Sequence, residues 1–323
     1  HTRQSDDAAA QADALQRAAA LAIRLSLPAR ATALFTRLAA LRGDEGALDV
    51  FVDAAAAYAS AGMHDETTTL AVGIGDGCTS SDTALAVRLR GAEMARERDD
   101  VEGELRLLRA AARGDAAGRA HLLAALRNRG RWQDLAAELE RDLSSPDADA
   151  AGHAASQLRL IYRDELGDPS RAIASALRAA ELRPNDPEAV GAYEEDLAAF
   201  ERWPDLVDHL VRRASMGATD ANDASALLMR AASIAEEQLD DPRRALRLAD
   251  SVLSGQPTHR EALELRTRSL TGLGRWKDAI EALEALAASL SGAEAAAAHE
   301  QAADIYELQL VRSDRALELW KLA

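Results

Sequence analysis

The feature that most constrains the fold of this chain is an internal repeat. A tryptophan that enters an amphipathic segment occurs at Trp132, Trp203 and Trp276. A weaker copy of the motif lies at 62–66, close to one period before Trp132. Self-similarity at a fixed period indicates units that bury their apolar faces against their neighbours. The 323 residues are therefore expected to form one long array rather than two or three ordinary domains.

A second motif lies between the tryptophans and shows that the repeat is double. The segments 166–173, 239–246 and 310–317 share a pattern that ends in Arg-Ala and an aliphatic residue, and they recur with the same period as the tryptophans. A partial copy at 27–31 lies two periods before the first of them. A unit of about 71 residues with two marks contains two helix pairs of about 35 residues each, so roughly nine pairs run through the chain.

Local signals predict that the repeated segments are helices joined by short turns. Asp168-Pro169, Asp186-Pro187 and Asp241-Pro242 each place an acidic N-cap before a proline at the first helical position. Six glycines lie between periodic segments, as expected of helix ends: Gly43, Gly62, Gly130, Gly217, Gly274 and Gly292. Alanine, the strongest helix former, accounts for roughly a quarter of the chain, while aromatic residues make up only 3%. The composition favours thin layers of closely packed helices, and an all-α chain.

The residues resemble the tetratricopeptide repeat, a family of helix pairs of about 34 residues. Ala172 and Ala179 fall on the small residues where the two helices of such a pair cross, and Pro184 falls on the terminal proline. Tyr162 and Tyr306 resemble the family's first-helix tyrosine, displaced by one inserted residue in the turn. The resemblance is good over 120–323 and degenerate over 1–119.

The resemblance implies a right-handed α-solenoid of about nine antiparallel helix pairs that forms one continuous domain over residues 1–323. The chain begins with His1 rather than methionine and ends inside an apolar helix at Trp320-Lys321-Leu322-Ala323. We therefore expect it to be a segment of a longer protein. The high alanine and arginine content is typical of GC-rich bacterial genomes.

Charge and composition exclude several classes of function. The formal net charge of −16 argues against nucleic acid and anionic lipid as partners, because both are bound by basic surfaces. No apolar run is long enough to span a membrane. The single cysteine, Cys78, allows no internal disulfide, so a cytoplasmic location is favoured over an oxidising one.

No residue pattern predicts an enzyme, a metal site or a cofactor. The glycine-rich segment 73–77 lacks the preceding strand and the Lys-Ser/Thr of a phosphate-binding loop, so we interpret it as a loop between helices. The seven histidines include no pair at helical spacing, and Cys78 has no neighbouring base. Acidic pairs such as Glu194-Glu195 and Glu236-Glu237 are interpreted as a solvated face, and the repeated tryptophans as buried packing residues.

The family resemblance also implies a binding surface, because family members bind partners along one stripe of the first helices, on the concave face. Transferred to this sequence, the stripe contains eight carboxylates and two arginines: Arg163, Glu188, Glu195, Glu236, Glu261, Glu264, Arg268, Glu300, Asp304 and Glu307. We therefore predict an acidic groove for a protein or peptide with a basic segment.

Three functions remain open at this stage. The first is a scaffold that binds a partner protein or peptide through the concave helical face. The second is a regulatory or targeting arm of a larger enzyme or sensor protein. The third is a structural subunit that stacks on itself to form a larger assembly.

Overall fold

The computed structural model describes residues 2–216 and 220–323, with side chains from residue 7 onward. These residues form helices and turns, and the described ranges contain no strand. The expected helix end at Gly217, like His1, lies outside the described residues. Two compact units are present, an N-terminal unit (His1–Ser144 and Asp164–Leu166) and a C-terminal unit (Ser145–Arg163 and Gly167–Ala323). That the two units form one continuous array stays a prediction.

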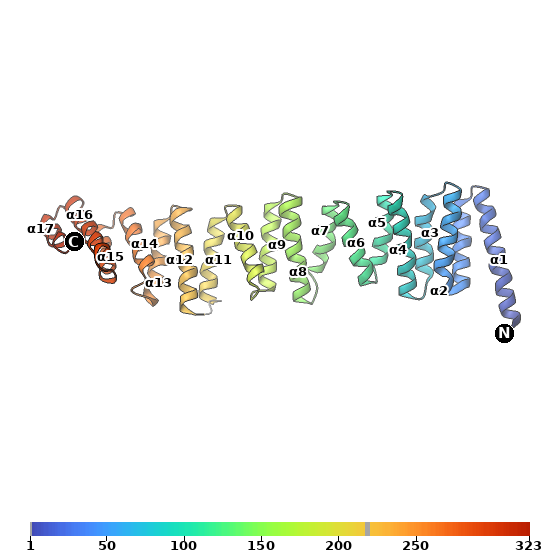
Figure 1. Ribbon diagram of the computed structural model, residues 1–323, viewed down its shortest axis with the longest axis horizontal. Helices are drawn as coiled ribbons and strands as arrows, with labels where there is room; N and C mark the ends of the chain where they lie inside the picture. Colours follow the sequence, from blue (N-terminus) through green and yellow to red (C-terminus); the bar gives the residue numbers. More distant parts are fainter. Residues whose placement is uncertain (1, 217–219) are drawn as a thin grey trace. The chain divides into compact units, whose positions relative to one another are not determined.

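The helices of the N-terminal unit pack in chain order, each against the next (Figure 1). They are α1 (Thr2–Arg24), α2 (Pro28–Ser60), α3 (Asp65–Gly77), α4 (Ser81–Glu97), α5 (Val101–Ala112), α6 (Ala116–Asn128) and α7 (Trp132–Asp142). None of the helices in the described part of the chain combines the length and the apolar character needed to cross a bilayer.

Although α2 is continuous by its hydrogen bonding, it contains two antiparallel helices. Gly43 interrupts it with a left-handed φ of 69° and a ψ of −174°. The hydroxyls of Thr32 and Tyr58 then lie 2.8 Å apart, although 26 residues separate them. In a straight helix with a rise of about 1.5 Å per residue, they would be about 39 Å apart. The chain therefore reverses at Gly43, as the sequence predicts for a helix end at this glycine.

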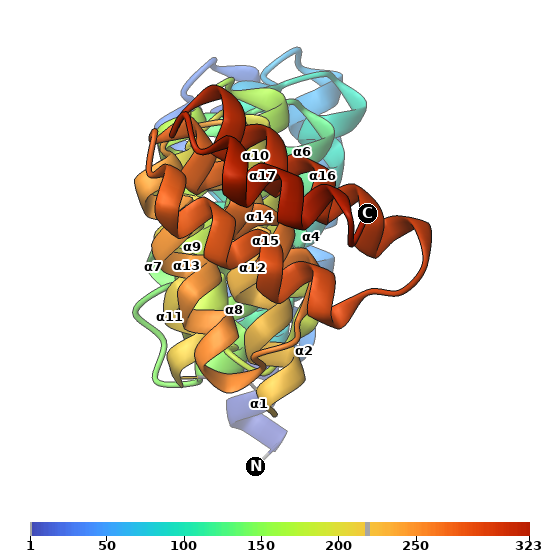
Figure 2. The ribbon, with the colours of Figure 1, turned by 90° about the vertical axis from the view of Figure 1, so that its left-hand side faces the viewer.

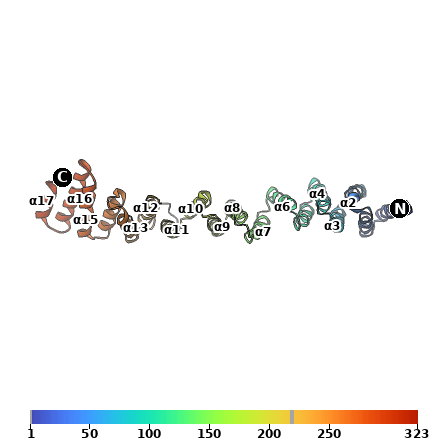
Figure 3. The same ribbon diagram turned by 90° about the horizontal axis from the view of Figure 1, so that it is seen from below.

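The C-terminal unit repeats the same arrangement. Its helices are α8 (Ala148–Leu160), continued by a turn of π-helix (Ile161–Glu165), α9 (Pro169–Leu182), α10 (Pro187–Ala199), α11 (Trp203–Met216), α12 (Ala221–Glu237), α13 (Pro242–Gly255), α14 (Arg260–Gly272), α15 (Trp276–Ser289), α16 (Ala293–Leu308) and α17 (Ser313–Trp320). Figure 3 views α8 and α9 nearly end-on, side by side, and α16 and α17 face the viewer in Figure 2.

A left-handed residue marks the turn between the two helices of every pair. Nine of the eleven left-handed residues in the described ranges lie in such turns, and the other two, Gly43 and Gly292, lie between pairs. The nine are Ser26, Gly62, Asp99, Gly130, Gly167, Glu201, Asp240, Gly274 and Val311. The helix before each turn is called the first helix here, and the helix after it the second. The described residues thus form nine antiparallel pairs, which confirms the all-α repeat and the number of pairs predicted from the sequence.

The two sequence motifs correspond to two types of turn. In the tryptophan type, the N–H one residue after the left-handed position donates to a carbonyl five residues back, as from Arg131 to Leu126 and from Arg275 to Leu270. In the other type the bond reaches six residues back, as from Asp168 to Tyr162. The π-helical turn that contains Tyr162 accommodates the extra residue. The insertion inferred beside this tyrosine is therefore confirmed.

The caps and crossing residues follow the sequence predictions. The carboxylates of Asp168 and Asp241 accept hydrogen bonds from the backbone N–H three residues on, at 3.0 and 2.9 Å. Ala172 and Ala179 are completely buried or nearly so, at 0% and 1% exposure. Small side chains at these crossings let the two helices of a pair approach closely. Larger apolar residues fill the space between neighbouring helix pairs.

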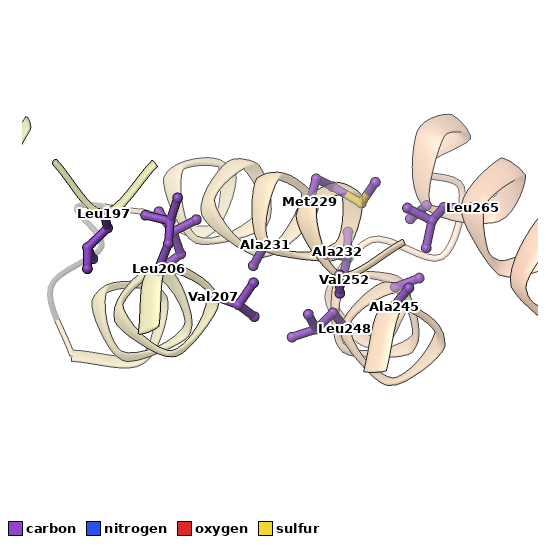
Figure 4. Packing of buried hydrophobic residues seen from close by; sticks show 14 of the residues in the cluster. Leu197, Leu206, Val207, Met229, Ala231, Ala232, Ala245, Leu248, Val252 and Leu265 are labelled. Carbon is purple, nitrogen blue, oxygen red and sulfur yellow. The ribbon is translucent and has the colours of Figure 1, made fainter. Parts of the chain in front are cut away.

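Figure 4 shows this packing around α11, α12 and α13 in the C-terminal unit. Leu206 and Val207 of α11, Ala231 and Ala232 of α12 and Leu248 of α13 belong to one buried cluster. All five are buried. Each apolar side chain removed from water contributes about 1.5–3 kcal/mol, so each pair depends on its neighbours for stability.

Two sequence interpretations are wrong in detail. The tryptophans Trp132, Trp203 and Trp276 are half-buried at the edge of the core rather than enclosed in it. The glycine-rich segment 73–77 is the last part of helix α3 and not a loop. Gly75 is buried there, and a Cβ on it would lie 2.9 Å from Nε of Arg88. Glycine at this position therefore allows α3 and α4 to pack closely, because a larger residue would displace the guanidinium of Arg88.

Candidate functional site

The predicted stripe lies on the first helices of the C-terminal unit, as the resemblance implies. Its members belong to α10, α12, α14 and α16, and to the π-helical turn that follows α8. Seven of the ten residues are exposed: Glu188, Glu195, Glu261, Arg268, Glu300, Asp304 and Glu307. The other three are half-buried: Arg163, Glu236 and Glu264. All ten residues therefore retain some contact with solvent.

The structure brings several stripe residues into ion pairs with one another or with residues beside the stripe. Arg268 of α14 donates to Glu236 of α12, with nitrogen–oxygen distances of 2.9 and 3.2 Å. Glu264 accepts from Arg260 at 2.8 Å, and the same guanidinium makes a bidentate contact of 3.0 Å with Glu294 of α16. These pairs join successive first helices, so part of the predicted acidic charge is neutralised within the protein.

The remaining carboxylates form a separate group. Glu188, Glu261, Glu300, Asp304 and Glu307 make no ion pair within the described part of the chain. The last three recur at intervals of four and three along α16, and so share one face of that helix. The uncompensated acidic charge of the stripe therefore lies on Glu188, on Glu261 and on this face of α16.

Two buried carboxylates on α10 were missed by the sequence analysis. Asp196 is 0% exposed and receives two hydrogen bonds from Arg159 of α8, at 2.6 and 2.7 Å. Glu194 is 5% exposed and accepts from Arg213 and Arg230, on α11 and α12. Glu195, between them, points to solvent. The interpretation of Glu194-Glu195 as a solvated face is therefore wrong for Glu194.

The electrostatics of Glu194 follow from its partners. Burial by itself would raise the pKa of this carboxyl. The hydrogen bond from Arg230, the imidazole of His209 at 3.4 Å, and the charges of Arg230 and Arg213 outweigh burial and lower its pKa to about 2. A carboxylate held ionised between two arginines fixes the geometry of three neighbouring helices rather than donating or accepting a proton in a reaction.

The signal for these buried acids was present in the sequence. On α10, Val190, Tyr193 and Leu197 form the apolar face, and Glu194 follows Val190 by four residues and precedes Leu197 by three. An acidic residue within an apolar stripe indicates a buried charge that needs a partner. The partners themselves come from other helices, so the sequence alone does not identify them.

Two hollows lie on the face of the first helices, one pair apart. The α12–α14 pocket has a volume of about 400 Å³. It is lined by Asn222, Ser225, Ala226, Met229, Arg230, Ser233, Gln256, His259 and Glu261. The α14–α16 pocket has a volume of about 360 Å³. It is lined by Arg260, Glu264, Thr267, Arg268, Leu286, Leu290, Glu294, Ala297, Ala298 and Gln301. Predicted stripe positions thus contribute to both pockets.

The linings combine polar and apolar groups. In the α14–α16 pocket, two arginines and two glutamates balance in charge, while Leu286 and Leu290 supply apolar surface. The buried hydroxyl Oγ1 of Thr267 has no hydrogen-bond partner in the described part of the chain. Such a lining suits a side chain with both apolar and polar parts, because a buried hydroxyl without a partner is costly.

The described residues contain no metal-binding cluster, and the surroundings of Cys78 disfavour its thiolate. No group of three or more His, Cys, Asp or Glu side chains is placed to hold a metal ion in the described ranges. Burial and the nearby carboxylate of Asp44 raise the pKa of the Cys78 thiol, which lowers its nucleophilicity. Its Sγ donates to the carbonyl of Ile74 at 3.3 Å.

Neither a protein-family model nor a curated protein sequence matches this chain. Among solved structures, the yeast Sti1 TPR2AB domain in complex with pHSP90 has 12% identity and a TM-score of 0.28, over 74% of this chain and 98% of that one. A tetratricopeptide repeat protein from Parabacteroides merdae has 16% identity and a TM-score of 0.29, with coverages of 74% and 91%. The P58(IPK) TPR domain has 14% identity and a TM-score of 0.27, with coverages of 96% and 98%. All three are tetratricopeptide-repeat proteins, the family that the sequence resembles, but TM-scores of this size carry no argument about partner or site.

Proposed function

We propose that this chain is a non-enzymatic protein-interaction module that holds a segment of a partner protein across the first helices of its C-terminal unit. The observation that carries the proposal is the pair of pockets, α12–α14 and α14–α16, on one face of consecutive repeats. A partner segment that lies along this face presents side chains to both hollows. Small hollows with mixed linings suit the recognition of side chains better than the enclosure of a whole ligand.

The ion pairs between first helices support this proposal, because they make the surface rigid. Arg268 with Glu236, and Arg260 with Glu294, hold α14 against its neighbours on both sides of the two pockets. A surface that is already ordered loses less conformational entropy on binding. The same pairs limit which residues contribute to recognition, since a paired carboxylate offers less charge to a partner.

The expected partner segment combines basic and apolar side chains. A basic side chain fits Glu261 at the α12–α14 pocket, because this exposed carboxylate has no internal partner in the described residues. An apolar side chain with a polar end fits the α14–α16 pocket beside Leu286, Leu290 and the hydroxyl of Thr267. This proposal refines the acidic groove expected from the sequence, in which all eight carboxylates are equivalent.

A peptide-display selection on the purified protein, followed by fluorescence anisotropy of the selected peptides, tests the proposal. Ala297 is exposed and lines the α14–α16 pocket, so Ala297→Trp fills the pocket without breaking an ion pair. We expect a loss of affinity of about tenfold or more, since each factor of ten corresponds to about 1.4 kcal/mol. Ala288→Trp, at an exposed position of α15, is the matched control and is expected to bind normally. Equal binding by both variants would show that the pocket is not the site.

The charge of the groove is tested with a second pair of variants. Glu261→Arg should weaken the binding of basic peptides, and more strongly at low ionic strength than at high. Glu284→Arg changes the charge of the protein equally, at an exposed position of α15 outside both pockets. A similar loss of affinity in both variants would attribute the effect to net charge rather than to the groove.

A further inference from the structure

A third hollow, in the N-terminal unit, has the opposite charge from the stripe. It lies between α5, α6 and α7 and has a volume of about 300 Å³. Its lining contains four arginines, one glutamate and two apolar residues: Arg109, Arg113, Arg119, Arg141, Glu138, Ala112 and Leu122. We call it the arginine pocket. Helices α5 and α7 are second helices, so this hollow differs from the proposed partner groove in both unit and face.

The charge of the chain is unevenly distributed, and the arginine pocket lies in its less acidic part. Residues 1–144 contain 18 basic and 22 acidic residues, whereas residues 145–323 contain 20 basic and 32 acidic residues. Within residues 83–144 the basic residues slightly exceed the acidic ones, by 12 to 11. An acidic partner would be repelled by most of the molecule and least by this region.

An arginine stripe runs along α5 to its C-cap residue, and two of its three members line the pocket. Arg106, Arg109 and Arg113 follow one another at intervals of three and four, so they share one face of the helix. The buried leucines Leu105 and Leu108 occupy other positions of α5. The helical pattern therefore turns the stripe toward solvent: Arg106 and Arg113 are exposed, and Arg109 is half-buried.

The internal partners of these arginines leave donors unused. Arg119 donates through Nη2 at 2.8 Å to both carboxylate oxygens of Asp142 and to the carbonyl of Glu138. Arg109 has one long contact of 3.4 Å with Asp134, and that carboxylate lies closer to Arg131, at 2.8 Å. Arg113 makes no ion pair in the described residues.

The ion pair between Arg141 and Glu138 also leaves N–H donors of the arginine unused. Arg141 donates to Glu138 at 2.6 Å through Nη1 alone, and the Arg141 side chain is 69% exposed. A guanidinium has five N–H donors in a planar fork that matches a carboxylate. Arg109, Arg113 and Arg141 therefore present free donors around the hollow, while Ala112 supplies accessible apolar surface.

We propose that the arginine pocket binds an acidic peptide segment of a partner, whose glutamate or aspartate carboxylates pair with Arg109, Arg113 and Arg141. Arginine forks give each carboxylate two hydrogen bonds as well as charge. The aliphatic part of a glutamate side chain then packs on Ala112. This site is independent of the groove on the C-terminal unit, and the two surfaces select segments of opposite charge.

Fluorescence anisotropy of a labelled oligoglutamate peptide tests this site on the full chain, with oligoglutamine of equal length as the neutral probe. We expect the glutamate peptide alone to bind, with an affinity that falls as salt rises. Because Arg113 has no ion pair to break, Arg113→Glu should leave folding unchanged and weaken binding by about tenfold or more. Circular dichroism melting curves check the folding of the variant.

Arg37→Glu is the matched control, because Arg37 is an exposed residue of α2 outside the arginine pocket. It changes the net charge of the same unit by the same amount. Equal weakening by both variants, or no binding of oligoglutamate to the unaltered protein, would overturn the proposal. A peptide with a single phosphoserine forms a further arm of the experiment. If it binds while oligoglutamate does not, the carboxylate assignment is wrong and the pocket selects phosphate.

Discussion

The N-terminal and C-terminal units share their turns and packing but differ in where they place their charges. Gly130 and Gly274 have the same left-handed conformation in equivalent turns of the two units. In the N-terminal unit, the buried carboxylate Glu104 belongs to a second helix and pairs with Arg96 and Arg129. In the C-terminal unit, Glu194 and Asp196 belong to a first helix. The apolar and turn positions therefore specify the helix pair, whereas the positions of the buried ion pairs differ between the two units.

The largest expected effect tests whether the apolar positions are equivalent. Leu135 of α7 and Leu206 of α11 each follow the repeated tryptophan by three residues, and they are 0% and 1% exposed. Changing either leucine to alanine removes buried apolar surface and leaves a cavity. Each substitution should lower the free energy of unfolding of its unit by about 4 kcal/mol. Hydrogen exchange followed by mass spectrometry separates the two units. A large loss in the free energy of unfolding of one unit and a negligible loss in the other would contradict the equivalence of the two leucines.

The next effect concerns the charges that differ between units. Asp196→Ala leaves the guanidinium of Arg159 buried without its two hydrogen bonds. We expect the free energy of unfolding of the C-terminal unit to fall by about 3 kcal/mol, because an unpaired buried charge is costly. Urea denaturation measures this loss. Glu195→Ala, at the exposed neighbouring residue, is the control and should have little effect.

Acidification should also affect the C-terminal unit through Glu194. Its pKa in the folded protein, about 2, is lower than its ordinary value of 4.5. The ionised carboxylate therefore stabilises the fold above pH 4.5, and this contribution is lost as the pH falls toward about 2. Unfolding free energies measured across this pH range should decrease more steeply in the unaltered protein than in Glu194→Gln. Parallel curves would contradict the assignment.

The smallest effect tests the shared turns. Gly130→Ala and Gly274→Ala place a Cβ at φ values of 64° and 66°. The nearest side-chain atoms would be 3.8 and 3.9 Å away, so backbone strain is the main cost. We expect each substitution to destabilise its unit by about 1 kcal/mol, and Glu201→Gly, which removes such strain, to stabilise by a similar amount. Thermal melts measure both directions, and a stabilising alanine would contradict the common turn.

The fold was predictable because its signals are local. The period of the tryptophan and Asp-Pro motifs gives the number of pairs, and Asp168 and Asp241 show directly where helices begin. The predicted stripe also lies on the first helices, although its role in binding stays a prediction. The glycine-rich segment 73–77 was misinterpreted because glycine is common both in turns and at close helix contacts. Only the position of Arg88 against Gly75 separates the two cases.

The sequence by itself determined the helices and their pairing, because caps, glycines and apolar spacing act within a few residues. The tertiary structure decided which charges are available for binding. Glu236 and Glu261 look alike in sequence, yet Arg268 of another helix pair neutralises Glu236, while Glu261 stays exposed and unpaired. A guanidinium reaches a carboxylate on another helix pair only after the helices have packed, so neither the partner groove nor the arginine pocket follows from local sequence.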